Sequence, residues 1–268
     1  MLDIILCATQ RCGSTLVVED MRNSGVLGQP EEWFIPWDPA KPDHDWKAAF
    51  DSVHRRARGE NGVTAVKIMA NQLFNLEACL ASFPDPASQD RPAPQGPRAA
   101  QGDFAHVAAA FRGGLWVWLR RNDVVSQAIS RLMAEQTGIN HATAQPEDPH
   151  FAGNLARGYN PDYNQGAQYR YGAILRHVTA ITVENLAWQR FFASHAITPL
   201  ELVYEDVIAD PGLTHLDRMA QGIGQDQPPP RQPRKMVKLA NERNAAWLDR
   251  FFHDAAEHRF QPPRPAKP

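Results

Sequence analysis

The chain has 268 residues, which is enough for one α/β domain with a sizeable core or at most two small domains. Its hydrophobic content of 43% and charged content of 22% are typical of a soluble globular protein, and its formal net charge of −2 speaks against a nucleic-acid-binding role. No segment is long and apolar enough to span a membrane, and the N-terminus lacks the basic start and cleavage site of a signal peptide. We therefore expect a cytoplasmic protein.

The three cysteines, Cys7, Cys12 and Cys79, form an odd set with no CxxC or metal-binding spacing. This usage suits a reducing compartment and predicts no metal site. Cys12 lies in a polar loop, where it is either a nucleophile or a small residue that fits a tight turn.

Four segments are rich in apolar and β-branched residues, as buried parallel strands are. They lie at residues 3–9, 62–70, 113–121 and 199–203. Amphipathic spacing or helix-breaking residues at the ends predict helices between and after these strands. The helices lie at residues 14–24, 71–83, 123–136 and 171–195, with another after residue 203.

Two segments lack these patterns: the Pro-rich residues 84–103 and the long polar residues 137–168 are predicted surface loops. Residues 235–252 follow a Pro-rich break and are interpreted as a basic, polar tail. Strands separated by helices imply parallel βαβ units with helices on both faces of the sheet. The sequence therefore predicts an α/β fold, a three-layer α/β/α sandwich with a central parallel sheet, in a single domain over residues 1–268.

Residues 8–15, "ATQRCGST", follow the first strand and open a helix, as the phosphate loop G-x-x-x-x-G-K-[ST] does. Ala8 replaces the first glycine and Ser14 replaces the lysine. Backbone N–H groups still form an anion cradle, with positive charge from Arg11 and hydroxyl donors from Ser14 and Thr15. No acidic Mg²⁺ ligand follows the second strand, so metal-assisted phosphoryl transfer is poorly supported. The alternative is a loop that only joins strand to helix.

A second candidate anion site follows the third strand, in "LRRNDVVSQAIS". Arg120 and Arg121 lie at the carboxyl edge of the predicted sheet, where open α/β sheets bind ligands. Asp123 is a predicted helix N-cap, and Ser126 and Ser130 are four residues apart on one helix face. The alternative is a surface arginine pair before a capped helix. Together with the first loop, this pattern indicates a nucleotide with phosphates at both ends.

The segment "GQPEEWF" places two carboxylates beside aromatic residues. Glu31 and Glu32 are indistinguishable as candidates for a general base, and both are alternatively solvated carboxylates at a helix start. Trp33, Phe34 and Trp37 suit a sugar, whose apolar face stacks on aromatic rings, or equally form a piece of the core.

These segments, in this order, resemble the bacterial trehalose 2-sulfotransferase family over residues 3 to about 252. The resemblance is carried by "QRCGSTLVVEDMRNSGVLGQPEEWF", "VKIMANQ", "RRNDVVSQAIS", "YGAILRHVTAITVENLAWQRFF" and "VYEDVIADP". It implies a P-loop-like sulfotransferase fold, the sulfuryl donor 3′-phosphoadenosine-5′-phosphosulfate (PAPS) without a metal, a carbohydrate or glycolipid acceptor, and a homodimer. A sulfuryl donor needs neither the kinase lysine nor magnesium, which accounts for Ser14.

The resemblance also implies roles for individual residues. Glu32 is the expected general base, and Lys67 stabilises charge on the leaving group or serves as a structural ion-pair partner. The implied donor-binding residues are Arg11, Cys12, Gly13, Ser14, Thr15, Arg121, Ser126, Ser130 and Arg243. The implied acceptor-binding residues are Gln10, Gln29, Pro30, Glu31, Trp33 and Phe34.

Gln29 stands where the trehalose enzymes carry a second acidic residue, so the acceptor and the hydroxyl that is sulfated stay open. Two other functions stay open as well. A small-molecule kinase would need ATP, Mg²⁺ and a loop lysine, and Ser14 argues against it. A non-catalytic nucleotide-binding protein on the same fold would bind the donor without turnover.

Overall fold

The computed structural model describes residues 3–41, 44–83, 103–144 and 158–259. The predicted loop at 84–103 lies almost wholly outside the described residues, and the loop at 137–168 lies partly outside them. The chain divides into two compact units, one formed by Met1–Asn122 with Thr182–Arg234 and the other by Asp123–Ile181 with Lys235–Pro268. A single domain over the whole chain stays a prediction.

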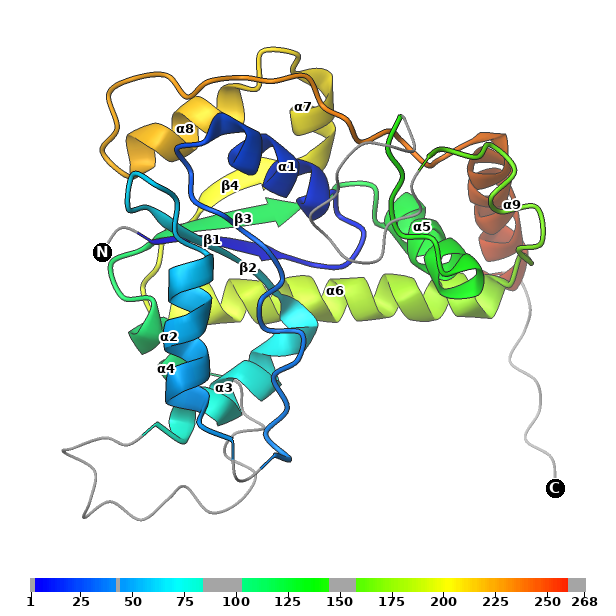
Figure 1. Ribbon diagram of the computed structural model, residues 1–268. Helices are drawn as coiled ribbons and strands as arrows, with labels where there is room; N and C mark the ends of the chain where they lie inside the picture. The colour runs from blue at the N-terminus through cyan, green and yellow to red at the C-terminus, as the bar shows by residue number, and fades with distance from the viewer. Residues whose placement is uncertain (1–2, 42–43, 84–102, 145–157, 260–268) are drawn as a thin grey trace, which may run out of the picture. The chain divides into compact units, whose positions relative to one another are not determined.

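The first unit is built on a four-stranded parallel sheet with the order β2-β1-β3-β4 (Figure 1). Its strands are β1 Asp3–Ala8, β2 Thr64–Met69, β3 Leu115–Arg120 and β4 Leu200–Val203. The register pairs Leu6 with Lys67 on one side of β1 and with Val117 on the other. Because all four strands are parallel, their carboxyl ends and the loops that follow them lie at one edge of the sheet.

Helices cover both faces of this sheet (Figure 1). One face carries α1 Ser14–Ser24, α7 Tyr204–Ala209 and α8 Thr214–Gly222. The other carries α2 Trp46–Arg56, α3 Leu73–Ala81, α4 Ala105–Ala110 and the C-terminal part of α6 Tyr171–Ser194, with the short 3₁₀ helix η1 Ala70–Gln72 between β2 and α3. The unit therefore has the three layers that the sequence predicted, and the predicted α/β class is confirmed.

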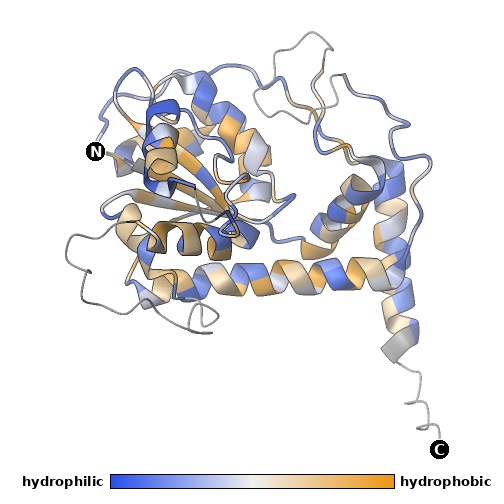
Figure 2. Ribbon diagram, turned by 60° about the horizontal axis from the view of Figure 1, so that its bottom comes forward, coloured by the Kyte–Doolittle hydropathy of each residue, from blue (hydrophilic) through white to orange (hydrophobic). Residues whose placement is uncertain are grey.

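The core of the first unit follows from strand alternation. Ile5 and Cys7 of β1 pack into an aromatic cluster that includes Trp188, while Ile4 and Leu6 point to the opposite face and are equally buried. Figure 2 shows the strands as largely hydrophobic. The indole N–H of Trp188 donates to the carbonyl of Ala8 at 3.0 Å, which fixes the end of β1 where the next loop begins.

The second unit contains α5 Val124–Thr137, the N-terminal part of α6 and α9 Glu242–Arg259. As predicted, Asp123 caps α5: its side chain accepts the N–H of Ser126 at 2.8 Å. The interpretation of residues 235–252 as a polar tail is wrong for its second half. There α9 buries Trp247 and Phe251 in a cluster with α5 residues, because these two aromatics lie one helical turn apart.

Among the residues that the structure describes, no helix combines the length and the apolar character needed to cross a bilayer.

Candidate active site

The loop that joins β1 to α1 (residues 9–13, called the β1–α1 loop) has an unusual backbone. Arg11 and Gly13 both have positive φ angles, 64° and 94°, and the N–H of Cys12 donates to the carbonyl of Thr9 at 3.3 Å. Gly13 is the N-cap of α1 and provides no side-chain cap. The first N–H groups of a helix lack partners within the helix and form its positive end, so this turn has the geometry of the predicted anion cradle.

The surroundings of Cys12 in the β1–α1 loop bear on its two alternative roles. Its side chain is fully buried, and burial raises the pKa of the thiol above its ordinary value. A buried, protonated thiol is a poor nucleophile. Cys12 is therefore a small residue that fills the turn.

Tyr204, the first residue after β4, connects this loop to the second predicted anion site. Its ring packs directly against Gly13, where an added Cβ would lie 2.3 Å from Cδ2 of the tyrosine. The guanidinium of Arg121 lies over the same ring, 4.7 Å from its centroid, and pairs with Glu205 at 3.8 Å. Gly13 and Arg121 thus contact one side chain. Tyr204 was not among the predicted site residues, although it is the second residue of the quoted segment "VYEDVIADP".

Arg120 and Arg121, adjacent in sequence, have different surroundings. Arg120 donates to Asn122 at 2.5 Å and pairs with Glu201 at 3.5 Å. The Nε atom of Arg121 is buried and has no hydrogen-bond partner among the described residues. Its 3.8 Å ion pair with Glu205 is too long for a hydrogen bond, and a buried guanidinium nitrogen without a hydrogen-bond acceptor is costly, so Arg121 is the better candidate to bind an added anion.

The acidic loop (residues 28–32) runs along the outer edge of β2. Gly28 has a φ of 75°, and a Cβ there would lie 2.7 Å from the backbone nitrogen of Ala65. Further along the two segments, the N–H of Lys67 donates to the carbonyl of Glu31 at 3.0 Å. Only glycine permits this close approach, which brings the side chain of Glu32 next to that of Lys67.

Lys67 links the acidic loop to the β1–α1 loop. Its ammonium pairs with Oε1 of Glu32 at 2.7 Å and donates to Oγ1 of Thr15 at 3.4 Å, while its side chain is only 2% exposed. A second contact reaches the other carboxylate oxygen: Nε2 of Gln72 donates to Oε2 of Glu32 at 3.4 Å. A buried ammonium thus lies between the start of α1 and a carboxylate that is partly open to solvent.

The two adjacent glutamates, which the sequence left indistinguishable, have different environments. Glu31 is buried and pairs with Arg22 of α1 at 3.4 Å. Burial raises its pKa to about 7, because loss of hydration outweighs the attraction of Arg22 and Lys67. The side chain of Glu32 is 30% exposed and adjoins Lys67. Glu32 is therefore the carboxylate that a bound molecule can reach.

The aromatic residues after Glu32 belong mostly to the core. Phe34 and Trp37 are almost fully buried and pack in the aromatic cluster of the first unit. Phe34 therefore has no surface for an acceptor, which corrects its predicted role. Trp33 is half-buried, donates from Nε1 to the carbonyl of Gln29 at 3.3 Å, and carries the guanidinium of Arg56 over its ring at 4.2 Å.

The remaining predicted acceptor-binding residues differ in accessibility. Gln10 is exposed and Gln29 is partly exposed, whereas Pro30 is buried. Pro30 therefore shapes the acidic loop and presents little surface to a ligand.

The remaining predicted donor residues lie in the second unit. Ser126 and Ser130 are half-buried on α5. Arg243 of α9 donates from Nη1 to the carbonyl of Ala167 at 3.3 Å. A role for these three residues in nucleotide binding stays a prediction.

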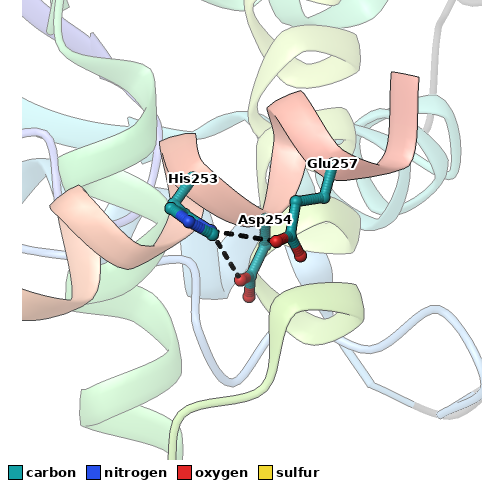
Figure 3. Close-up of side chains that lie close together, drawn as sticks. All are labelled: His253, Asp254 and Glu257. Atoms are coloured by element: carbon teal, nitrogen blue, oxygen red, sulfur yellow. Dashed lines mark ion pairs between the residues drawn. The ribbon is translucent and has the colours of Figure 1, made fainter. Parts of the chain in front are cut away.

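A cluster of potential metal ligands lies elsewhere on α9, formed by His253, Asp254 and Glu257 (Figure 3). His253 is 3.9 Å from Asp254 and 3.7 Å from Glu257. Asp254 already accepts a hydrogen bond from Tyr169 at 2.7 Å and pairs with Arg250 at 3.8 Å. This exposed group forms ordinary surface ion pairs and gives no reason to infer a metal centre.

The fold and the candidate site are those of an α/β protein that presents a helix N-terminal turn, a buried lysine and a reachable carboxylate at the carboxyl edge of a parallel sheet. The profile of the family described as Stf0 sulphotransferase matches residues 3–254, so the chain belongs to this sulfotransferase family. The resemblance found in the sequence is confirmed.

Individual relatives agree with this assignment. The trehalose 2-sulfotransferase of Mycobacterium tuberculosis is 30% identical over 283 residues, and that of Mycolicibacterium smegmatis is 26% identical over 284 residues; both alignments cover 94% of each chain. Among solved structures, a sulfotransferase from Alicyclobacillus acidocaldarius has a TM-score of 0.44 and 13% identity, and the match covers 94% of this chain and 96% of the other.

Proposed function

We propose that this chain transfers a sulfuryl group from PAPS to a hydroxyl of a carbohydrate or glycolipid acceptor, with Glu32 as general base. The observation that carries the proposal is the ion pair between Glu32 and Lys67 beside Thr15. It brings a proton acceptor and a positive charge together next to the start of α1. The names of the relatives support a carbohydrate acceptor, while Gln29 leaves the particular sugar open.

The residues of the first unit fit a donor with phosphate groups at both ends. The β1–α1 loop offers the helix N-terminus and the hydroxyls of Ser14 and Thr15 to the 5′-phosphosulfate, with charge from Arg11. Arg121, whose Nε has no hydrogen-bond acceptor within the described part of the chain and lies 3.8 Å from Glu205, would bind the 3′-phosphate. Ser126, Ser130 and Arg243, which lie in the second unit, are proposed by the family resemblance as further nucleotide-binding residues. PAPS supplies the sulfuryl group and a leaving bisphosphate.

In the proposed reaction, Glu32 accepts the proton of the attacking hydroxyl. The acceptor oxygen forms a bond to sulfur while the bond from sulfur to the leaving phosphate oxygen breaks, so negative charge moves to the leaving side. Protonation neutralises Glu32 and frees the ammonium of Lys67 from its partner. Lys67 then stabilises the new charge near Thr15, whose Oγ1 is already 3.4 Å away.

On the acceptor side, the exposed Gln10 and the partly exposed Gln29 and Trp33 are proposed to contact the sugar. Trp33 presents one face to Arg56, so at most its other face or edge is available for stacking. Glu31 supports the acidic loop through Arg22. A homodimer and a cytoplasmic location remain predictions.

The first experiment tests the donor. Adenosine 3′,5′-bisphosphate should raise the thermal midpoint, since a ligand at a hundredfold excess over its dissociation constant adds about 2.7 kcal/mol of stability. Arg121→Ala should reduce this shift. Arg120→Ala is the matched control, because Arg120 already pairs with Glu201 and Asn122. A larger shift with ATP and Mg²⁺ than with the bisphosphate would favour the kinase instead.

The second experiment tests the base. Purified protein is incubated with radiolabelled PAPS and a panel of sugars that begins with trehalose. Glu32→Gln should lower the rate by about 100-fold or more, the size expected for a lost general base. Glu31→Gln is the matched control and should retain most of the rate at pH 7. Equal losses in both variants would refute the assignment of Glu32, and donor binding without turnover across the panel would favour a non-catalytic protein.

A further inference from the structure

Gln72 lies in η1, three residues after β2 ends, and its side chain bridges two parts of the site. Its Oε1 accepts the backbone N–H of Met69 at 3.0 Å, and its Nε2 donates to Oε2 of Glu32 at 3.4 Å. A backbone N–H is always a donor, so the amide oxygen must face Met69 and the amide nitrogen must face Glu32. The orientation of this amide is therefore determined by the strand.

Two side chains contact the Glu32 carboxylate, one from β2 and one from η1, which directly follows it. Lys67, within the strand, pairs with Oε1 at 2.7 Å, and Gln72, anchored to the last residue of the strand, binds Oε2 at 3.4 Å. The two carboxylate oxygens are thus held separately, which fixes the carboxylate plane. A carboxylate has about four lone-pair positions, so two contacts leave acceptor capacity for an incoming proton.

We propose that Gln72 is a positioning residue for the reaction: it holds the Glu32 carboxylate at the angle at which its free lone pairs meet the acceptor hydroxyl. This inference rests on the proposed function of Glu32 and extends it to a residue that acts through the Glu32 carboxylate. Holding a catalytic group in one orientation raises the rate because less freedom is lost on the way to the transition state.

Gln72→Glu is the sharpest variant because it separates the two bonds of Gln72. A glutamate can still accept the N–H of Met69, so η1 keeps its support, but it presents an oxygen to Oε2 of Glu32 where the wild type presents a donor. Gln72→Met removes both contacts at similar length. A purely local structural role predicts that Gln72→Glu resembles the wild type and Gln72→Met does not. The positioning role predicts the larger functional change in Gln72→Glu.

The primary readout needs no acceptor. The carboxyl carbon of Glu32 is followed by ¹³C NMR in glutamate-labelled protein, and its resonance is assigned by its absence in Glu32→Gln. Lys67 pairs with Glu32, and the carboxyl of Glu31 interacts with it electrostatically, so Glu31→Gln serves to exclude the titration of Glu31. We expect the titration curve of this resonance in Gln72→Glu to differ from that of the wild type, and to differ less in Gln72→Met. Superimposable titration curves in the wild type and Gln72→Glu would overturn the proposal.

The second readout is the rate with PAPS and the best acceptor of the panel. Gln72→Glu should lower kcat about tenfold or more, shift the acid limb of the pH–rate profile to higher pH, and leave the bisphosphate-induced thermal shift unchanged. In a Glu32→Gln background, the same change should have little further effect. Full activity of Glu32→Gln would refute the proposed base, whereas a normal kcat in Gln72→Glu with an inactive Glu32→Gln would refute only the positioning role.

Discussion

Replacing Gly13 with alanine tests how the β1–α1 loop is held against Tyr204. Gly13 has a φ of +94°, and a Cβ on it would lie 2.3 Å from Cδ2 and 2.6 Å from Cε2 of the tyrosine ring. The same ring carries the guanidinium of Arg121, so it cannot swing away without disturbing that contact. We expect Gly13→Ala to destabilise the first unit and to weaken binding of the bisphosphate.

The magnitude has two parts. The left-handed backbone costs an alanine about 1–2 kcal/mol. Inserting a methyl group against a packed ring costs about 1–3 kcal/mol more. The sum, about 2–5 kcal/mol, is a large share of the roughly 5–15 kcal/mol that stabilises an ordinary folded protein. Gly25 provides the matched control: its φ is +71° and nothing lies within 4 Å of an added Cβ, so Gly25→Ala carries only the backbone part.

The assay is urea denaturation of both variants, followed by tryptophan fluorescence at equal protein concentration. Gly13→Ala should lose clearly more stability than Gly25→Ala. Tyr204→Leu should relieve part of the excess, so the double variant should lose less than the sum of the single changes. Equal destabilisation in the two glycine variants would show that the loop and the tyrosine do not pack as described.

Three further changes test other parts of the first unit. Lys67→Met should lower kcat by about 100-fold, measured by turnover of PAPS, while the bisphosphate still binds. Folding raises the pKa of Glu31 from 4.5 to about 7, so the wild type loses stability as pH rises through this range and the unfolded carboxyl ionises first. Glu31→Gln lacks this loss, so urea unfolding should show the variant gaining stability relative to the wild type between about pH 4.5 and 7. Asp20→Asn should lower the free energy of unfolding by about 3 kcal/mol, because the fully buried Asp20 carboxylate binds Arg234 through two nitrogens.

The sheet was largely predictable from the sequence because its strands are buried on both faces. Residues 3–9 and 62–70 were predicted as strands, and the structure has them at Asp3–Ala8 and Thr64–Met69. Helix α2 was not predicted, although Asp45 supplies an N-cap and Trp46, Phe50 and Val53 supply a buried stripe. Helices α2 and α9 are polar overall, so the narrow apolar face of each was not recognised from the sequence.

The site was predictable in its residue types but not in its pairings. Local sequence cannot distinguish Glu31 from Glu32, because the difference arises from a contact between the acidic loop and β2 that Gly28 permits. The same holds for Phe34, whose burial depends on helices far along the chain. Gln72 and Tyr204 were within quoted segments, but their partners are 40 and 191 residues distant in sequence.

Position 14 carries a serine instead of the phosphate-loop lysine, and β2 supplies an ammonium group close to it. A phosphate-loop lysine would place its charge from within the loop, whereas here the ammonium of Lys67 reaches Thr15, the next residue, from the neighbouring strand. In the reaction that we propose, this arrangement lets the same charge pair with Glu32 at the start and with the leaving group afterwards. A loop lysine without a carboxylate partner would attract the donor more strongly in the ground state. Under the proposed mechanism, the charge of Lys67 is released only when Glu32 takes the proton, so its stabilisation is concentrated in the transition state.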